Sequence, residues 1–345
     1  MTISETFPSF DVEQTLLVSF LASQGLMSAN EEASFSRLTG GVSSDIWKVD
    51  LPGRTFAVKR ALGKLKVAAD WEAPLTRNAY EWAWLQFASE HVPDNVPRPI
   101  ARDAEAGLFA MSFLPLQMYP VWKAQLMAGH IESSVANDVG RVLGKLHAAS
   151  AAKPDLAAKF DSAENFHALR LEPYLLATAA RNPNVADVLV EIAERTRDTR
   201  LALVHGDVSP KNILVGPKGP VFLDAECAWY GDPAFDLAFC LNHLLLKCIV
   251  QPDGRDALIQ CFETLARQYL QQVSWEPADR LEARAASLLP ALLLARVDGK
   301  SPVEYLIQEK HKELVRTVAF GFLRQPVSRL MEVANGWRVA LARDC

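Results

Sequence analysis

The sequence lacks the features of a secreted or metal-stapled protein. It has 5 cysteines in 345 residues, an odd number without a CxxC pair, so neither a disulfide framework nor a zinc site is expected. The N-terminal segment MTISETFPSFDVEQ lacks the basic and apolar regions of a signal peptide. Together these absences predict a cytoplasmic protein with reduced thiols.

Long apolar runs and basic runs are also missing. The most apolar windows, residues 237–250 and 285–297, are short and interrupted by charged side chains, so neither is expected to span a bilayer. The net charge is −5, with Lys+Arg 36 against Asp+Glu 41. We therefore expect no membrane and no nucleic acid as partner. The sequence does not indicate an oligomeric state.

Two kinase signatures are absent as well. No Walker A motif occurs, which argues against a P-loop kinase. The stretch from Asp224 to Gly231 is too short for a peptide-docking activation loop, and no A-P-E segment follows it, which argues against a protein kinase.

The apolar content is high enough for two lobes. Hydrophobic residues make up 50% of the chain. Before residue 114, a helix at 11–27, strand patterns at 35–50 and 55–59, a helix at 77–89 and a hairpin at 100–113 are expected. We therefore predict an α+β fold that begins with a small β-rich lobe.

The remainder of the chain has helical patterns. Leu114-Pro115 ends the last strand of the first lobe, and Pro154, Pro173 and Pro183 are expected to break helices. The expected helices cover residues 135–149, 237–250, 255–272, 277–297 and 303–322. The predicted division is a nucleotide-binding lobe at 1–113 and a larger, mostly helical catalytic lobe at 114–345.

One stretch of the second lobe, LVHGDVSPKNILVGPKGPVFLDAE, carries the clearest chemical pattern. Two short apolar runs around a Gly/Pro turn predict a β-hairpin, with Asp207, Asn212 and Asp224 at its edges. Two carboxylates and a carboxamide in this arrangement suit metal-dependent phosphoryl transfer. One acid accepts the proton of the attacking hydroxyl, and the other acid and the amide supply oxygens to Mg²⁺.

The first lobe supplies residues suited to a nucleotide. A turn with Gly40, Gly41, Ser43 and Ser44 can bring backbone amides against phosphate oxygens, although most such turns are simple hairpins. Lys59 ends a strand after this turn and can reach the phosphates of a nucleotide. On the helix at 77–89, Glu81 can pair with Lys59 and orient it; the alternative is a solvated helix charge.

This set of residues resembles the aminoglycoside phosphotransferase and choline kinase superfamily. The Gly-rich turn, the strand lysine, the helix glutamate, HGDVSPKN and LDAE…GDPAFD carry the resemblance, which spans roughly residues 35 to 325. The segment WEAPLT and the D-x-E at 224–226 resemble methylthioribose kinases. The ending SPKN is closer to the wider superfamily, and no adjacent Arg pair occurs near the C-terminus.

The resemblance implies a protein-kinase-like, two-lobed enzyme that uses ATP and Mg²⁺ and phosphorylates a hydroxyl of a small molecule. Asp207 would be the catalytic base, and Asn212, Asp224 and Glu226 the metal ligands. The nucleotide would be bound by Gly40, Gly41, Ser43, Ser44, Lys59 and Glu81, and at the linker by Ser112, Phe113 and Leu114. Asp232 and Asp236 would bond backbone around the catalytic loop; the alternative is that they cap the helix that begins near Pro233.

The acceptor stays open at this stage. Arg296, Asp298 and Lys300 form a polar cluster that either binds substrate or caps helix ends, and Trp71 and Trp122 are further candidates for the acceptor pocket. A sugar-like or small amino-alcohol acceptor is favoured, with a methylthioribose-like sugar as one such molecule. The alternatives are an aminoglycoside phosphotransferase, which would need an acidic wall, and a non-catalytic pseudokinase-like binding module.

Overall fold

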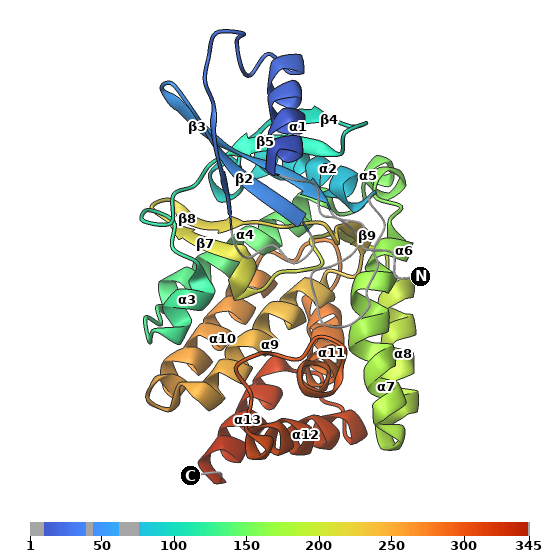
Figure 1. Ribbon diagram of the computed structural model, residues 1–345. Coiled ribbons are helices and arrows are strands. Elements are labelled where there is room, and N and C mark those ends of the chain that lie inside the picture. Colours follow the sequence, from blue (N-terminus) through green and yellow to red (C-terminus); the bar gives the residue numbers. More distant parts are fainter. Residues whose placement is uncertain (1–9, 39–43, 62–75, 344–345) are drawn as a thin grey trace, which may run out of the picture.

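The computed structural model describes residues 10–38, 44–61 and 76–343. Gly40, Gly41, Ser43 and Trp71 lie outside these ranges, so the structure does not bear on the roles expected of them. In Figure 1 the large sheet lies at the top, a two-stranded hairpin lies below it, and helices fill the lower part of the molecule.

The N-terminal part is built on a five-stranded antiparallel sheet of order β1-β2-β3-β5-β4. The strands are β1 (Ser34–Arg37), β2 (Ser44–Leu51), β3 (Arg54–Ala61), β4 (Pro99–Asp103) and β5 (Leu108–Ser112). Helix α1 (Phe10–Ser23) packs Leu17, Phe20 and Leu21 against buried residues of this sheet. Helix α2 (Arg77–His91) contacts β3 and β4 and buries its apolar residues in the larger core.

The remainder is mostly helical. The longer helices are α4 (Ser133–Ser150), α8 (Ala186–Asp198), α9 (Ala234–Val250), α10 (Arg255–Leu270), α11 (Ala278–Asp298), α12 (Glu309–Arg324) and α13 (Leu330–Arg343). Helix α9 is buried along nearly its whole length and packs against both α10 and α11. The short helices α3 (Trp122–Met127), α5 (Pro154–Lys159), α6 (Ala163–Phe166) and α7 (Ala177–Arg181) lie between the longer ones in the chain.

Two small antiparallel sheets lie between the large sheet and the helices. Strand β6 (Ala202–Val204) pairs with β9 (Trp229–Gly231), and β7 (Ile213–Gly216) forms a hairpin with β8 (Gly219–Phe222). The hairpin expected around the Gly/Pro turn is therefore present. The expected division into a small β-rich part and a larger helical part is also present, while its exact boundary at residue 113 stays a prediction.

Some expectations about helices are wrong. Pro173 does not break a helix, because it lies inside a π-helix, η2 (His167–Leu176), that continues from α6 into α7. A π turn bonds residue i to i+5, and its wider turn relieves the clash that a proline ring has with the carbonyl of the preceding turn in an α-helix. The helix expected from residue 303 begins only at Glu309, and α13 was not expected. No described helix is both long and apolar enough for a transmembrane span.

Candidate active site

The loop after β6 carries His205, Gly206 and Asp207. Gly206 has φ of 79°, and a Cβ there would lie 2.6 Å from the backbone oxygen of Cys227, so no other residue fits without strain. The backbone N–H groups of His205 and Gly206 donate to Asp236 at 2.7 and 2.8 Å. The first turn of α9 therefore holds the loop in place, as expected for Asp236.

Histidine 205 fastens the same loop to its surroundings. Its Nδ1 accepts the N–H of Asp207 at 3.2 Å, so Nε2 donates to the carbonyl of Leu223 at 3.1 Å. Trp84 of α2 packs edge-on against the imidazole at 4.8 Å between ring centroids. Burial lowers the pKa of His205, which keeps the ring neutral and suited to both bonds.

Asp207 is buried, and three side chains converge on one oxygen of its carboxylate. Asn212 Nδ2 donates to Oδ2 at 2.7 Å, Arg170 Nη2 lies 3.0 Å from it, and Lys211 Nζ lies 3.3 Å from it. The other oxygen, Oδ1, has no hydrogen-bond partner among the described residues. The carboxylate is therefore held by one oxygen and has the other left to accept a proton.

Lys59 joins the sheet to the catalytic stretch. Its ammonium lies 2.7 Å from Oε1 of Glu81, so the expected ion pair is present, and it also contacts Oδ1 of Asp224. The three residues come from β3, α2 and the segment after β8, which are far apart in the sequence. This contact brings the proposed phosphate-binding lysine and a proposed metal ligand together.

Burial disfavours the charges of all three residues, and their mutual attraction outweighs it for Lys59 and Asp224 but not for Glu81. Burial lowers the pKa of Lys59, but the carboxylates of Asp224 and Glu81 outweigh it and raise the pKa. Burial likewise opposes ionisation of Asp224, whose pKa Lys59 nevertheless lowers to about 2. For Glu81 burial prevails and raises the pKa to about 7.

Each of the expected metal ligands has one polar atom engaged by another side chain. The amide nitrogen of Asn212 is used on Asp207, and one oxygen of Asp224 contacts Lys59, which leaves one oxygen on each for a metal. Oε2 of Glu226 accepts a 2.9 Å bond from Nε of the fully buried Arg77. Mg²⁺ is usually bound by one or two protein side chains, and phosphates and waters complete its coordination, so two protein oxygens suit it. Consistently, no group of three or more His, Cys, Asp or Glu side chains able to hold a metal occurs in the described ranges.

The other nucleotide-site candidates lie where the sheet ends. Ser112 closes β5, and its backbone and hydroxyl bond to the backbone of Arg98 at 2.9 Å. Phe113 follows, with Lys48 Nζ 5.4 Å from its ring centroid, and Leu114 is half-buried. Ser44 begins β2, and its hydroxyl is buried without a hydrogen-bond partner within the described residues. This leaves the Ser44 hydroxyl available for a ligand.

The expected substrate cluster of Arg296, Asp298 and Lys300 does not form one group in the structure. Asp298 pairs with Arg316 at 2.9 Å, and Lys300 pairs with Glu172 at 2.7 Å, so both charges are already neutralised. Arg296 is 9% exposed and donates to Tyr174 Oη at 3.0 Å. Trp122 lies within the hydrophobic core. Of these candidates, only Arg296 is without an ion pair to a described carboxylate.

Sequence reasoning missed Arg170 and Arg77. Arg170 lies on η2 with its guanidinium carbon 5.6 Å from the ring centroids of both Tyr174 and Phe239. It pairs with Asp207, and Arg77 with Glu226, across long stretches of chain that leave no local motif. Lys211, by contrast, lies between the motif residues Asp207 and Asn212 and had a sequence signal that was passed over.

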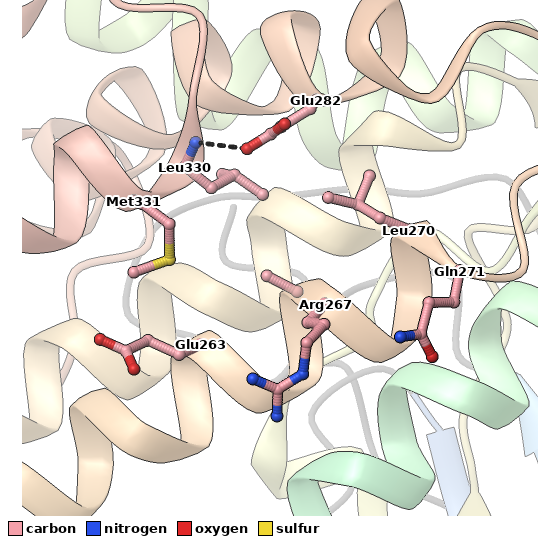
Figure 2. A pocket seen from close by; sticks show the side chains of 8 residues that line it. Glu263, Arg267, Leu270, Gln271, Glu282, Leu330 and Met331 are labelled. Carbon is pink, nitrogen blue, oxygen red and sulfur yellow. Dashed lines mark hydrogen bonds between the residues drawn. The ribbon is translucent and has the colours of Figure 1, made fainter.

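A pocket of about 550 Å³ lies elsewhere, between α10, α11 and α13. Figure 2 shows Glu263, Arg267, Gln271 and Met331 around it, with Glu282 accepting the backbone N–H of Leu330 at 3.0 Å. None of the sequence-predicted site residues lines this pocket.

Residues 34–247 match the phosphotransferase enzyme family. This chain belongs to that family. A methylthioribose kinase from Escherichia coli is 26% identical over 274 residues, covering 70% of this chain and 64% of that enzyme. Methylthioribose kinase 1 of Oryza sativa is 23% identical over 277 residues, covering 71% and 64%. The chain thus matches less than two thirds of the length of either relative.

Solved structures show the same fold at low identity. An ethanolamine kinase from Plasmodium vivax has a TM-score of 0.58 at 13% identity, over 94% of each chain. An amicoumacin kinase in complex with AMP-PNP and Ca²⁺ has a TM-score of 0.55 at 13% identity, over 94% of this chain and 98% of that one. These similarities confirm the protein-kinase-like fold that the sequence predicts.

Proposed function

We propose that this protein is an ATP- and Mg²⁺-dependent small-molecule kinase. It transfers the γ-phosphate of ATP to a hydroxyl of a sugar-like or small amino-alcohol metabolite. Membership of the phosphotransferase family supports the reaction class. The free, buried thiols of the four described cysteines support a cytoplasmic location, where thiols stay reduced.

The observation that carries the proposal is the contact of Lys59 with both Glu81 and Asp224. In a kinase of this fold, the lysine of the sheet must reach the phosphates while the acid after the hairpin holds the metal. Here both groups meet at one point, and Asn212 ties this region to Asp207. Stabilising the fold alone does not require a lysine buried between two carboxylates with a third carboxylate, that of Asp207, nearby.

Asp207 orients the acceptor hydroxyl and takes its proton through Oδ1. Arg170, Lys211 and Asn212 hold the other oxygen and fix the direction of the carboxylate. Asn212 and Asp224 would each offer an oxygen to Mg²⁺, and Glu226 would be a further ligand of the metal. The bound metal would neutralise charge on the phosphates.

The nucleotide is held by residues of the first lobe. Lys59, oriented by Glu81, would contact the phosphates. Gly40, Gly41, Ser43 and Ser44, of which the structure describes only Ser44, would bind them as the sequence predicts. The backbone of Ser112, Phe113 and Leu114 receives the adenine. Most of the rate then comes from alignment of the hydroxyl with the γ-phosphate and from neutralised charge.

An acceptor without several positive charges, such as a methylthioribose-like sugar, fits better than a polycationic one. Arg170 and Lys211 lie beside Asp207, and positive charges there repel a polycationic aminoglycoside. The relatives that are methylthioribose kinases point the same way. A pseudokinase is disfavoured because every described catalytic position is filled.

The test is ATP consumption by the purified protein with sugars, methylthioribose, amino alcohols and aminoglycosides, each with and without Mg²⁺. Asp207→Asn is the matched negative control. We expect at least one sugar-like acceptor to stimulate ADP release in the wild type only. Binding of Mg-AMP-PNP is measured in parallel, and its absence together with no acceptor-stimulated turnover rejects the kinase.

A further inference from the structure

One face of α9 leads from the catalytic loop toward a second group of cations. Asp236 at the start of this helix holds His205 and Gly206. One turn further, Phe239 packs against the ring of Tyr174 and lies under Arg170. His243 and Lys247 follow at intervals of four residues, so they lie on the same face of the helix as Phe239.

Lys247 is buried, and no carboxylate of the described residues pairs with it. Its side chain belongs to a residue that is 1% exposed, and its ammonium has one hydrogen bond, a long one of 3.4 Å to the carbonyl of His243 on its own helix. It lies 5.2 Å from the ring centroid of Tyr305 and forms no ion pair with any described carboxylate. Buried lysines are rarely left in this state, because desolvating an unpaired charge is costly.

Arg296 is the second cation without a counter-charge. It comes from α11, which packs along α9, and its guanidinium carbon lies 5.5 Å from the ring centroid of Tyr174. It donates to the neutral oxygens of Tyr174 and Ser301, but its Nε has no hydrogen-bond partner within the described chain. The buried hydroxyl of Tyr305 has no partner there either.

The nearby carboxylate does not neutralise these charges. Glu304 is committed to Lys123, whose short helix α3 contacts α9 and the turn that carries Lys211. Burial lowers the pKa of His243, and the positive charges of Arg296, Lys247, Lys211 and Lys123 lower it further. The charged groups that act on His243 are therefore cations, from Lys211 beside Asp207 to Lys247 on the same helix.

We propose that Lys247, Arg296, His243 and Tyr305, here called the cationic cluster, bind an anionic group on the acceptor, a carboxylate or a phosphate. A lysine supplies a point charge, an arginine its planar fork, and an imidazole and a phenol supply further donors for such a group. This inference rests on the proposed kinase function and deepens it. The acceptor is then an alcohol with a negatively charged end, whose hydroxyl reaches Asp207.

The test compares acceptors that differ in charge. Glycerol is paired with glycerate, and ribose with ribose 5-phosphate; ethanolamine is the cationic acceptor. ADP release is measured for each acceptor at saturating Mg-ATP. We expect kcat/KM to be at least about tenfold higher for the anionic member of a pair, as charge-assisted bonds to a buried ligand provide. A panel in which no anionic member exceeds its neutral partner overturns the inference.

The variant Lys247→Met assigns the preference to the cluster. We expect it to reduce the ratio of kcat/KM, anionic over neutral, by at least about tenfold. The exposed Lys145 of α4 provides the matched control, and Lys145→Met should keep the ratio. An unchanged ratio in Lys247→Met overturns the assignment of the preference to the cationic cluster. If the variant does not fold, the comparison of acceptors with the wild-type protein still tests the preference for an anionic acceptor.

The experiments distinguish an error in this inference from an error in the proposed kinase function. A protein that phosphorylates neutral or cationic members best is still a kinase, but the cationic cluster then has another role. A protein that neither binds Mg-AMP-PNP nor consumes ATP with any member contradicts both proposals.

Discussion

The guanidinium of Arg170 lies 3.0 Å from the carboxylate of Asp207, and both side chains are buried. Arg170 also donates from Nε to the carbonyl of Gly206, so it holds both the backbone and the side chain of the catalytic loop. It comes from the π-helix η2, whose wider turn is a common device at functional sites. Arg170 therefore acts as a positioning residue for the proposed base.

Replacement of the base itself should remove most turnover. Asp207→Asn keeps the shape of the side chain and its contact with Asn212 but cannot take a proton. We expect kcat to fall by on the order of 10²-fold or more, the usual contribution of a general base. Steady-state kinetics with the best acceptor measures this, and near-normal turnover would exclude Asp207 from the role.

Loss of Arg170 should affect stability as well as catalysis. In Arg170→Met the buried carboxylate of Asp207 loses its buried cation and keeps only Asn212 and the half-exposed Lys211, which costs up to about 3–5 kcal/mol in the free energy of unfolding. Urea denaturation measures this cost. The exposed pair of Arg200 and Asp161 offers a control, since Arg200→Met should change stability by less than about 1 kcal/mol.

A double-mutant cycle separates the ion pair from other effects of Arg170. In the Asp207→Asn background the buried charge is already gone, so Arg170→Met should cost clearly less there. Additive costs would show that Arg170 stabilises the loop only through its backbone bond.

The catalytic stretch could be predicted from the sequence because its parts are local. Asp207 and Asn212 are five residues apart and bond to each other, and the Gly/Pro turn brings Asp224 back beside them. Short-range spacing and turn chemistry therefore determine this half of the site. The pairing of Lys59 with Glu81 was one of two alternatives, favoured only because the other parts of the site are present, since nothing in their separate helix and strand patterns requires it.

The supporting residues could not be predicted because their contacts are long-range. Arg77 and Glu226 are 149 positions apart, and only packing of α2 against the second lobe brings them together. The π-helix that carries Arg170 was hidden by Pro173, which predicts a break by ordinary α-helical rules. Burial of Lys247 likewise depends on α9 being covered on all sides, which its own sequence does not specify.

Lys59 should matter mainly for the use of ATP. Lys59→Met removes the ammonium that Glu81 orients, and we expect KM for ATP to rise at least about tenfold, as for loss of a charge-assisted bond. Glu81→Gln should have a smaller effect, because Asp224 still holds the lysine. ATP kinetics with the exposed Lys159→Met as control measures the difference, and unchanged kinetics in Lys59→Met would contradict the role.

The two acids of the D-x-E segment should respond differently to Mg²⁺. Each acid has one oxygen in an ion pair, Asp224 with Lys59 and Glu226 with Arg77, but the side chain of Asp224 is 28% exposed and that of Glu226 only 9%. We expect Asp224→Asn to raise the Mg²⁺ concentration for half-maximal activity by about tenfold or more, and Glu226→Gln to raise it less. Titration of activity with free Mg²⁺ at constant ATP measures both. An equal shift for the two variants would mean that Glu226 contributes as much to Mg²⁺ binding as Asp224 does.

Lys247 should give the ligand-free protein a stability that rises with pH. Burial lowers its pKa to about 7, with smaller effects of Lys123, Glu304, Cys240 and Arg296, whereas an unfolded lysine has a pKa near 10.5.

Between pH 7 and 10 the folded state therefore holds fewer protons than the unfolded state, and its stability increases with pH by at most about 1.4 kcal/mol per unit. Urea denaturation of wild type and Lys247→Met from pH 6 to 9 isolates the effect, since other groups cancel in the difference. Above pH 7 the free energy of unfolding of the wild type should increase relative to that of the variant. A constant difference between the two free energies would mean that Lys247 stays charged in the folded protein.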